Sequence, residues 1–190
     1  MKQTIGAIFL FVCLATGIQA HCTTLPDACG PDKIQFDVRT TKHAPAPAPP
    51  AAGKAQIVFV ELVDKSNAGA CFGCSFTTRV GVDGAWVGAN KGKSYFTVAV
   101  DPGEHHVCTD WQSISGRVRG NVGVASFSAE AGKVYYYQVT IRSTPGPVFG
   151  PPNGAVVSAA NWSLPLARLG DDEGRYRVKI SALATAKQKK

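Results

Sequence analysis

A few cysteines and two adjacent histidines are the residues of this chain whose types could do chemistry. Cys71 and Cys74 are separated by two residues, and His105, His106 and Cys108 fall within four positions. A Cys-x-x-Cys pair can carry out thiol–disulfide exchange when a helix N-terminus lowers the thiol pKa, and it can supply two of the four ligands of a zinc site. One hypothesis is therefore an extracytoplasmic thiol-redox or metal-binding protein that uses Cys71, Cys74, His106 and Cys108.

The elements around these residues favour neither chemistry. The Cys71–Cys74 pair leads directly into SFTTRV, a β-type run, and it is the only such pair in the chain. Neighbouring residues on a strand point to opposite faces, so His105 and His106 should not share an ion, whereas His106 and Cys108 lie on one face. We favour histidines that face solvent on a strand, and we expect no metal and no cofactor.

The first twenty residues have the pattern of a secretory signal peptide. Lys2 precedes an apolar run at 5–18 that lacks charge, and Ala20 ends a suitable cleavage site. The run is shorter than the roughly 20 residues needed to cross a bilayer, and no later stretch approaches that length. We predict an exported protein, periplasmic or secreted, without stable membrane insertion after the signal is cleaved.

In an oxidising compartment the remaining cysteines are expected to form disulfides. They are Cys22, Cys29, Cys71, Cys74 and Cys108, an odd number, so at least one is free or pairs outside the chain. Spacing alone does not give the pairing. Our hypothesis is two bridges among the last four, one of which ties the N-terminal segment to the main domain.

Composition shifts divide the chain into five parts. The signal peptide, residues 1–20, is followed by a cysteine-containing N-terminal segment at 21–41 and by KHAPAPAPPAAG at 42–53. Alternating Pro and Ala cannot build a core, so we expect a stiff, extended linker of polyproline II type. A β-sandwich domain should occupy 54–183, and residues 184–190 should be a solvated basic tail.

The main domain has apolar residues at a spacing of two, which is typical of strands. In 133–142 one face carries Tyr135, Tyr137, Val139 and Ile141, and Ser94–Val100 alternates in the same way. Residues 55–63 form an apolar run interrupted by Gln56 and Glu61, which is consistent with a central strand. Further strand candidates are 75–82, 85–88, 104–109, 117–127 and 156–161.

Turn signals separate these runs. Asp83-Gly84 is typical of a two-residue hairpin, and the Pro- and Gly-rich residues 144–154 are expected to be a loop. The pattern predicts an all-β fold, an antiparallel β-sandwich of about seven to nine short strands. Residues 171–181 fit either a short C-terminal helix that begins at Asp171 or an edge strand, and we favour the helix.

Composition excludes several classes of protein. The 190 residues are 45% hydrophobic with 20 Gly and 12 Pro, but they show no Gly-X-Y period and no heptads, which excludes collagen and coiled coils. Without Lys2, 19 basic residues outnumber 13 acidic ones. The positive charges are spread along the chain, so we expect no nucleic-acid partner. The chain lacks G-x-S-x-G, H-E-x-x-H and a phosphate loop, and we predict no enzymatic activity and no catalytic residues.

Aromatic residues near turns offer one candidate binding surface. Trp86 lies beside the Asp83-Gly84 turn and Trp111 follows Cys108. Rigid aromatic rings are common in carbohydrate and peptide binding, which keeps a glycan-binding domain, or a hydrolase assembled from loop residues, as a further possibility. Packing in the core is the interpretation that we favour for each tryptophan.

Motifs in the main domain resemble a family of bacterial envelope proteins. They are the hairpin D-G-x-x-V-G at Asp83, P-G-x-H at Pro102, and A-G-K-x-Y-Y at Ala131. With this pattern, residues 55 to about 180 resemble domain of unknown function 2846 and, in turn, PEGA-type β-domains. The resemblance implies a β-sandwich in the cell envelope and transfers no catalytic residue. Many members look like lipoproteins, whereas here the cysteines near the signal peptide follow Val12 and His21.

Together these patterns predict a non-enzymatic, exported β-sandwich module. Its role would be binding or structural, in the bacterial cell envelope, and the expected partner is an envelope protein or a glycan.

Overall fold

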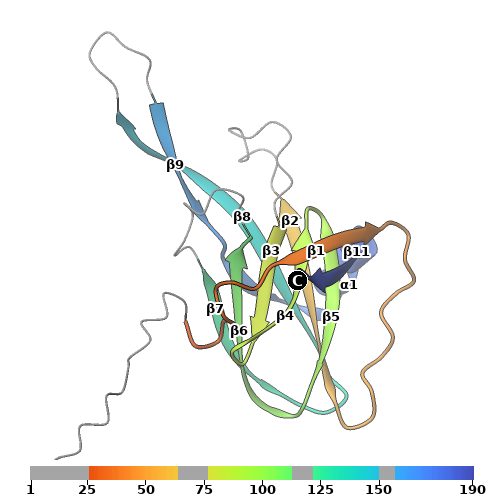
Figure 1. Cartoon of the computed structure of the whole chain (residues 1–190). Helices are drawn as coiled ribbons and strands as arrows, with labels where there is room; N and C mark the ends of the chain where they lie inside the picture. Colours follow the sequence, from red (N-terminus) through yellow and green to blue (C-terminus); the bar gives the residue numbers. More distant parts are fainter. Residues whose placement is uncertain (1–25, 64–76, 113–121, 150–156) are drawn as a thin grey trace, which may run out of the picture.

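The computed structural model describes residues 26–63, 77–112, 122–149 and 157–190, which form strands and one short helix (Figure 1). The elements are β1 Phe36–Thr41, β2 Ala55–Val63, β3 Thr77–Val82, β4 Ala85–Lys91, β5 Ser94–Val100, β6 Gly103–Trp111, β7 Gly123–Ala129, β8 Val134–Phe149, β9 Val157–Ser163, β10 Leu166–Leu169, α1 Asp171–Lys179 and β11 Ala182–Gln188. The all-β fold with one short helix is confirmed, and the described residues hold more strands than the seven to nine expected.

The strands form two sheets. The larger sheet has the order β1-β11-β5-β2-β8-β10, with β9 paired to β8, and the smaller sheet has the order β4-β3-β6-β7. All pairs of the smaller sheet are antiparallel. In the larger sheet β2 runs parallel to β8, and β11 runs parallel to β5, so this sheet is mixed.

The main core lies between the two sheets, as the period of two requires. Ile57, Phe59, Tyr135 and Tyr137 of the larger sheet pack against a smaller-sheet set that includes Phe127. The Phe127 ring lies 4.9 Å from Tyr135 and 5.5 Å from Tyr137, centroid to centroid. The tyrosines of β8 that were predicted to share one face therefore do share it, and that face is the inner one.

Each sheet also has an outer face that another element covers. Helix α1 covers part of the larger sheet, where Val178 packs with Val58, Val60, Tyr95 and Tyr136. Residues before β1 cover the smaller sheet around Cys108 and Trp86. The domain therefore has a central core and two apolar layers outside it.

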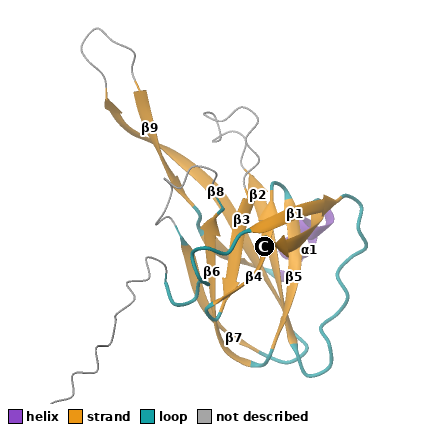
Figure 2. Ribbon diagram, viewed as in Figure 1, coloured by secondary structure: helices purple, strands orange, loops and turns teal. Residues whose placement is uncertain are grey.

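Helix α1 decides between the two structures predicted for residues 171–181. Asp171, Asp172 and Glu173 fill its first turn, and Arg177 and Lys179 lie in its last turn. This charge order complements the helix dipole. Figure 2 draws α1 in purple, and Figure 1 labels α1 and β11 near one another.

The solvated basic tail expected at 184–190 is wrong for most of its length. Residues up to Gln188 belong to β11, which pairs with β1 and with β5. Ala184 is buried in the main core, whereas Lys187 is exposed. Small apolar residues alternate with polar ones here, and the terminal lysines obscured that strand pattern.

The loop expected at 144–154 is also wrong for its first part. Residues 144–149 continue β8 and pair with β9, with a register shift between Pro145 and Val148. An irregularity of this kind accommodates proline in a strand, because proline has no amide to donate to the ladder. In Figures 1 and 2 the β8–β9 ribbon projects away from the two sheets.

The Asp83-Gly84 turn joins β3 to β4 as its sequence predicts. Both residues have positive φ, 50° for Asp83 and 82° for Gly84, as a type I′ hairpin requires. The register shifts just before the turn, between Val80 and Gly81.

Candidate functional site

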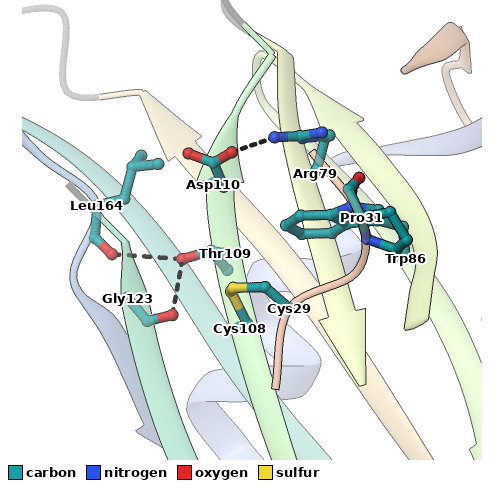
Figure 3. The surroundings of a disulfide bond; sticks show 9 residues. All are labelled: Cys29, Pro31, Arg79, Trp86, Cys108, Thr109, Asp110, Gly123 and Leu164. Atoms are coloured by element: carbon teal, nitrogen blue, oxygen red, sulfur yellow. Dashed lines mark hydrogen bonds and ion pairs between the residues drawn. A yellow bond between two sulfur atoms is a disulfide. The ribbon is translucent and has the colours of Figure 1, made fainter. Parts of the chain in front are cut away.

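A buried disulfide joins the N-terminal segment to the smaller sheet. Cys29 and Cys108 are bonded across 79 positions of sequence (Figure 3), and both are buried. The prediction that one bridge ties the N-terminal segment to the sandwich across the Pro/Ala-rich segment is confirmed. Cys22, Cys71 and Cys74 lie outside the described residues.

Arg79 on β3 is the second attachment point of the N-terminal segment. Its guanidinium donates to the carbonyls of Asp32 (2.8 Å) and Ile34 (2.6 Å) and forms a buried ion pair with Asp110 on β6. The guanidinium carbon also lies 4.3 Å from the centroid of the Trp86 ring. Arg79 therefore fixes the backbone of the segment with its charge already neutralised.

Two further side chains bind the backbone of the same segment. The Trp86 indole donates to the Pro31 carbonyl (2.8 Å). The Gln112 amide accepts from the Phe36 N–H and donates to the Phe36 carbonyl, both at 2.6 Å. Gln112 thus binds Phe36 as a neighbouring strand would. The N-terminal segment is held by a covalent bond and by several directional hydrogen bonds.

The candidate aromatic binding surface at Trp86 and Trp111, which was the less favoured alternative, is contradicted because both side chains are buried. Trp86 is 9% exposed and packs with the disulfide, and Trp111 is 8% exposed and packs with Ile141 and Leu164. Trp86 points away from the main core, but the N-terminal segment covers it. Core packing, which we favoured for each tryptophan, is what the structure shows.

The two histidines of β6 have different surroundings, because neighbouring side chains of a strand point to opposite faces. The His105 ring contacts the Asp83 carboxylate (2.6 Å) and the Asp101 carbonyl (2.7 Å). His106 is exposed, and its ring contacts the Ser126 hydroxyl (2.7 Å). Cys108 is bonded to Cys29 and so cannot act with His106 as a metal ligand. Within the described ranges, no three His, Cys, Asp or Glu side chains are grouped closely enough to hold a metal ion.

The Asp83–His105 pair strengthens the hairpin turn. Partial burial acts to raise the pKa of Asp83, but the His106 amide and the His105 ring outweigh it and lower that pKa. Burial acts to lower the pKa of His105, whereas the Asp83 carboxylate and the Asp101 carbonyl raise it overall. Both shifts favour the charged pair, which holds the β3–β4 turn against β6.

Glu61 is an ionisable residue in the main core that sequence reasoning did not select. It is fully buried on β2 and lies near Thr78 and Gly92. Burial raises the pKa of Glu61 to about 8, although the nearby Thr78 side chain and Gly92 backbone act to lower it. The carboxyl group therefore holds its proton at neutral pH. The signal was the single acidic residue in the apolar run Ala55–Val63.

A groove lies on the outer face of the larger sheet, between that face, α1 and the Pro/Ala-rich segment. Its volume is about 720 Å³, within the range of small-molecule sites. Val58, Tyr95 and Tyr136 line it from the sheet, and Val178 lines it from α1. Residues 42–53 form neither helix nor strand, and in Figure 1 they run as a long loop from β1 to β2. The Tyr95 hydroxyl donates to the Pro45 carbonyl at 3.2 Å.

A smaller cavity of about 410 Å³ continues from the groove. The two share Val134, Tyr136 and Arg175. The smaller cavity adds Arg168, whose guanidinium carbon lies 4.9 Å from the centroid of the Tyr135 ring. Sequence reasoning missed both cavities, because their walls come from distant parts of the chain.

Comparison of the chain with protein-family models, curated proteins and solved structures finds no match. The resemblance to domain of unknown function 2846 therefore stays a prediction. In the part of the chain that is described, no helix has the length and apolar character needed to span a membrane.

Proposed function

We propose that this protein is an exported, non-enzymatic β-sandwich module with a binding role in the bacterial cell envelope. The buried Cys29–Cys108 disulfide is the observation that carries the proposal. Disulfides persist in the periplasm and outside the cell and are rare in a reducing cytoplasm. The position of this bridge, between the N-terminal segment and the smaller sheet, suits a structural brace.

Other reactive or charged side chains support the same function. Arg79 and Asp110 form a buried ion pair that holds the N-terminal segment, and His105 with Asp83 holds a hairpin turn. Each of these groups already has partners that fix the backbone. The cavities on the larger sheet offer space for a ligand, which supports a binding role.

The proposal is tested by expressing the full chain in a bacterial host, fractionating the cells, and measuring the mass and the free thiols of the product. We expect a chain cleaved after Ala20 in the periplasm or the medium, a Cys29–Cys108 peptide on mapping, and one free thiol. Full-length, fully reduced protein in the cytoplasm would contradict export.

The same measurement tests the thiol-redox or metal-binding alternative. That alternative needs Cys71, Cys74, His106 and Cys108, and the bridge to Cys29 removes Cys108 from the set. Three or more free thiols in the exported chain, or zinc that copurifies with it, would favour the alternative over a structural role for the cysteines.

A further inference from the structure

Basic residues gather at one end of the groove, around the beginning of β11. Thr41, which precedes Lys42, is paired with Leu183, and Ser94, which follows Lys93, is paired with Ala182. Lys179 ends α1 just before β11. All three lysines line the groove, together with His43 and Arg175, and no acidic residue is among the described residues that line it.

Within the described residues, no ion pair neutralises the lysines at this end of the groove. Among the described residues, the ion pairs of the structure use Arg175 with Asp172 and Arg177 with Glu173, but none involves Lys42, Lys93 or Lys179. The acidic residues of α1 lie in its first turn, at the opposite end of the helix from Lys179. A ligand with a negative charge would complement these three ammonium groups.

The rest of the groove is apolar and offers few hydrogen-bonding groups. Val58, Tyr136, Val134 and Val178 line its length, and the Tyr95 hydroxyl is already bonded to Pro45. β2 is paired with β5 on one side and with β8 on the other, and β5 is paired on both sides at Ser94 and Tyr95, where it borders the groove. An extended peptide therefore has no strand edge to pair with here, and its backbone groups would lose their water without replacement.

We propose that the groove binds a single-chain anionic amphiphile, with a carboxylate near Lys93 and Lys179 and an alkyl chain along Val58 and Tyr136. The inference rests on the proposed binding role and names the ligand class for it. The groove volume of about 720 Å³ suits a ligand of this size. The Pro/Ala-rich segment forms the wall that shields the alkyl chain from water.

The test is calorimetric titration of the mature protein, residues 21–190, with dodecanoate below its micelle concentration. Dodecyltrimethylammonium has the same tail with the opposite charge, and butanoate has the same headgroup with a short tail. We expect dodecanoate to bind and each comparison ligand to bind at least about tenfold more weakly, because both the charge and the apolar surface contribute.

Matched variants locate the site. The double variant Lys93→Gln/Lys179→Gln should weaken dodecanoate binding about tenfold, since it removes two exposed charge contacts. The control Arg177→Gln/Lys187→Gln removes the same charge from residues that do not line the groove, and it should leave the affinity within about twofold. All four positions are at or near the surface, so both proteins should fold.

Several outcomes would overturn the inference. Equal weakening by the two double variants would mean non-specific attraction to a basic protein. If dodecyltrimethylammonium bound as tightly as dodecanoate, the lysines would not determine the ligand's charge. If hexaglutamate bound more tightly than dodecanoate, the ligand would be an acidic peptide. No dodecanoate binding would refute the ligand class, whereas the export and the structural disulfide are judged separately by the fractionation and the thiol count.

Discussion

The two sheets cover their outer faces in different ways. The N-terminal segment covers the smaller sheet and is held by a disulfide, by Arg79 and by Gln112. Helix α1 and the Pro/Ala-rich segment cover the larger sheet, mainly by apolar packing and by the hydrogen bond from Tyr95 to Pro45.

The difference between the covers explains where the groove lies. Directional bonds draw the N-terminal segment onto the smaller sheet, where Trp86 and Cys108 are buried. Proline has no amide donor, so the Pro/Ala-rich segment can form few hydrogen bonds with the larger sheet. A space of about 720 Å³ remains beneath it. The rigidly bonded cover supplies stability, and the loosely bonded one leaves room for a ligand.

Removal of the disulfide should have the largest effect, because it removes the covalent attachment that distinguishes the N-terminal segment from the cover of the larger sheet. The variant Cys29→Ser/Cys108→Ser opens a loop of 79 positions, and the loss of chain constraint is expected to lower the free energy of unfolding by about 4.5 kcal/mol. Denaturant unfolding of a chain of residues 21–190 measures the change. In hydrogen-exchange measurements, the amides of residues 26–36 should lose more protection than the amides of α1. Equal loss of protection in these two regions would contradict the separate roles of the two covers.

The pH dependence of stability tests the burial of Glu61 between the two sheets. Its pKa is 4.5 in model compounds and about 8 in the folded protein, so the unfolded chain releases a proton that the folded protein retains. Stability from this group is therefore complete below about pH 4.5 and is lost as the pH rises towards and through about 8. At pH 7 the loss is about 3 kcal/mol.

The variant Glu61→Gln should lack this pH dependence. The measurement is the free energy of unfolding of both proteins from pH 4.5 to 8, and the quantity of interest is their difference, in which Asp83 and His105 cancel. The variant should gain stability relative to the original protein as the pH rises. A constant difference would mean that Glu61 does not titrate in this range.

The period of two predicted most of the central strands and the inner face of the sandwich, but it missed β11 and the end of β8. Tyr135 and Tyr137 share the predicted face, and Asp83-Gly84 forms the predicted turn. The pattern identifies which residues share a face, but it does not say what covers that face. For this reason Trp86 was considered as a surface residue, although the N-terminal segment buries it.

Contacts between segments that are distant in the sequence could not be predicted from local patterns. The bridge from the N-terminal segment was expected, but the choice of Cys108 depends on the register of β6 beside β3. The groove combines residues 42–49 with β2, β5, β8 and α1, so no local pattern marks it. Glu61 interrupts an apolar run, yet its burial depends on the facing strands.

The substitution Gly174→Ala has the smallest expected effect on stability. It changes only the contact between helix α1 and the larger sheet. Gly174 is buried where α1 meets the larger sheet, and a methyl group there would overlap the Tyr136 ring. Alanine favours a helix over glycine by about 1 kcal/mol, so an isolated α1 would gain from Gly174→Ala. In the folded protein the overlap must displace α1, and we expect a net loss of about 1 to 2 kcal/mol.

The matched control for this substitution is Gly170→Ala at the beginning of the same helix. An added methyl group at Gly170 has open space around it, and its φ of −69° suits alanine. The N-cap preference for glycine over alanine is then largely offset by the lower entropy of alanine in the unfolded chain, so the net loss should be only a few tenths of a kcal/mol. Thermal unfolding compares the two variants. If Gly174→Ala were as stable as the control or more stable, α1 would not be packed on Tyr136 as described. A loss of stability well above about 2 kcal/mol would mean that displacing α1 also disturbs the larger sheet. Helix α1 would then be held as firmly as the disulfide-bonded N-terminal segment.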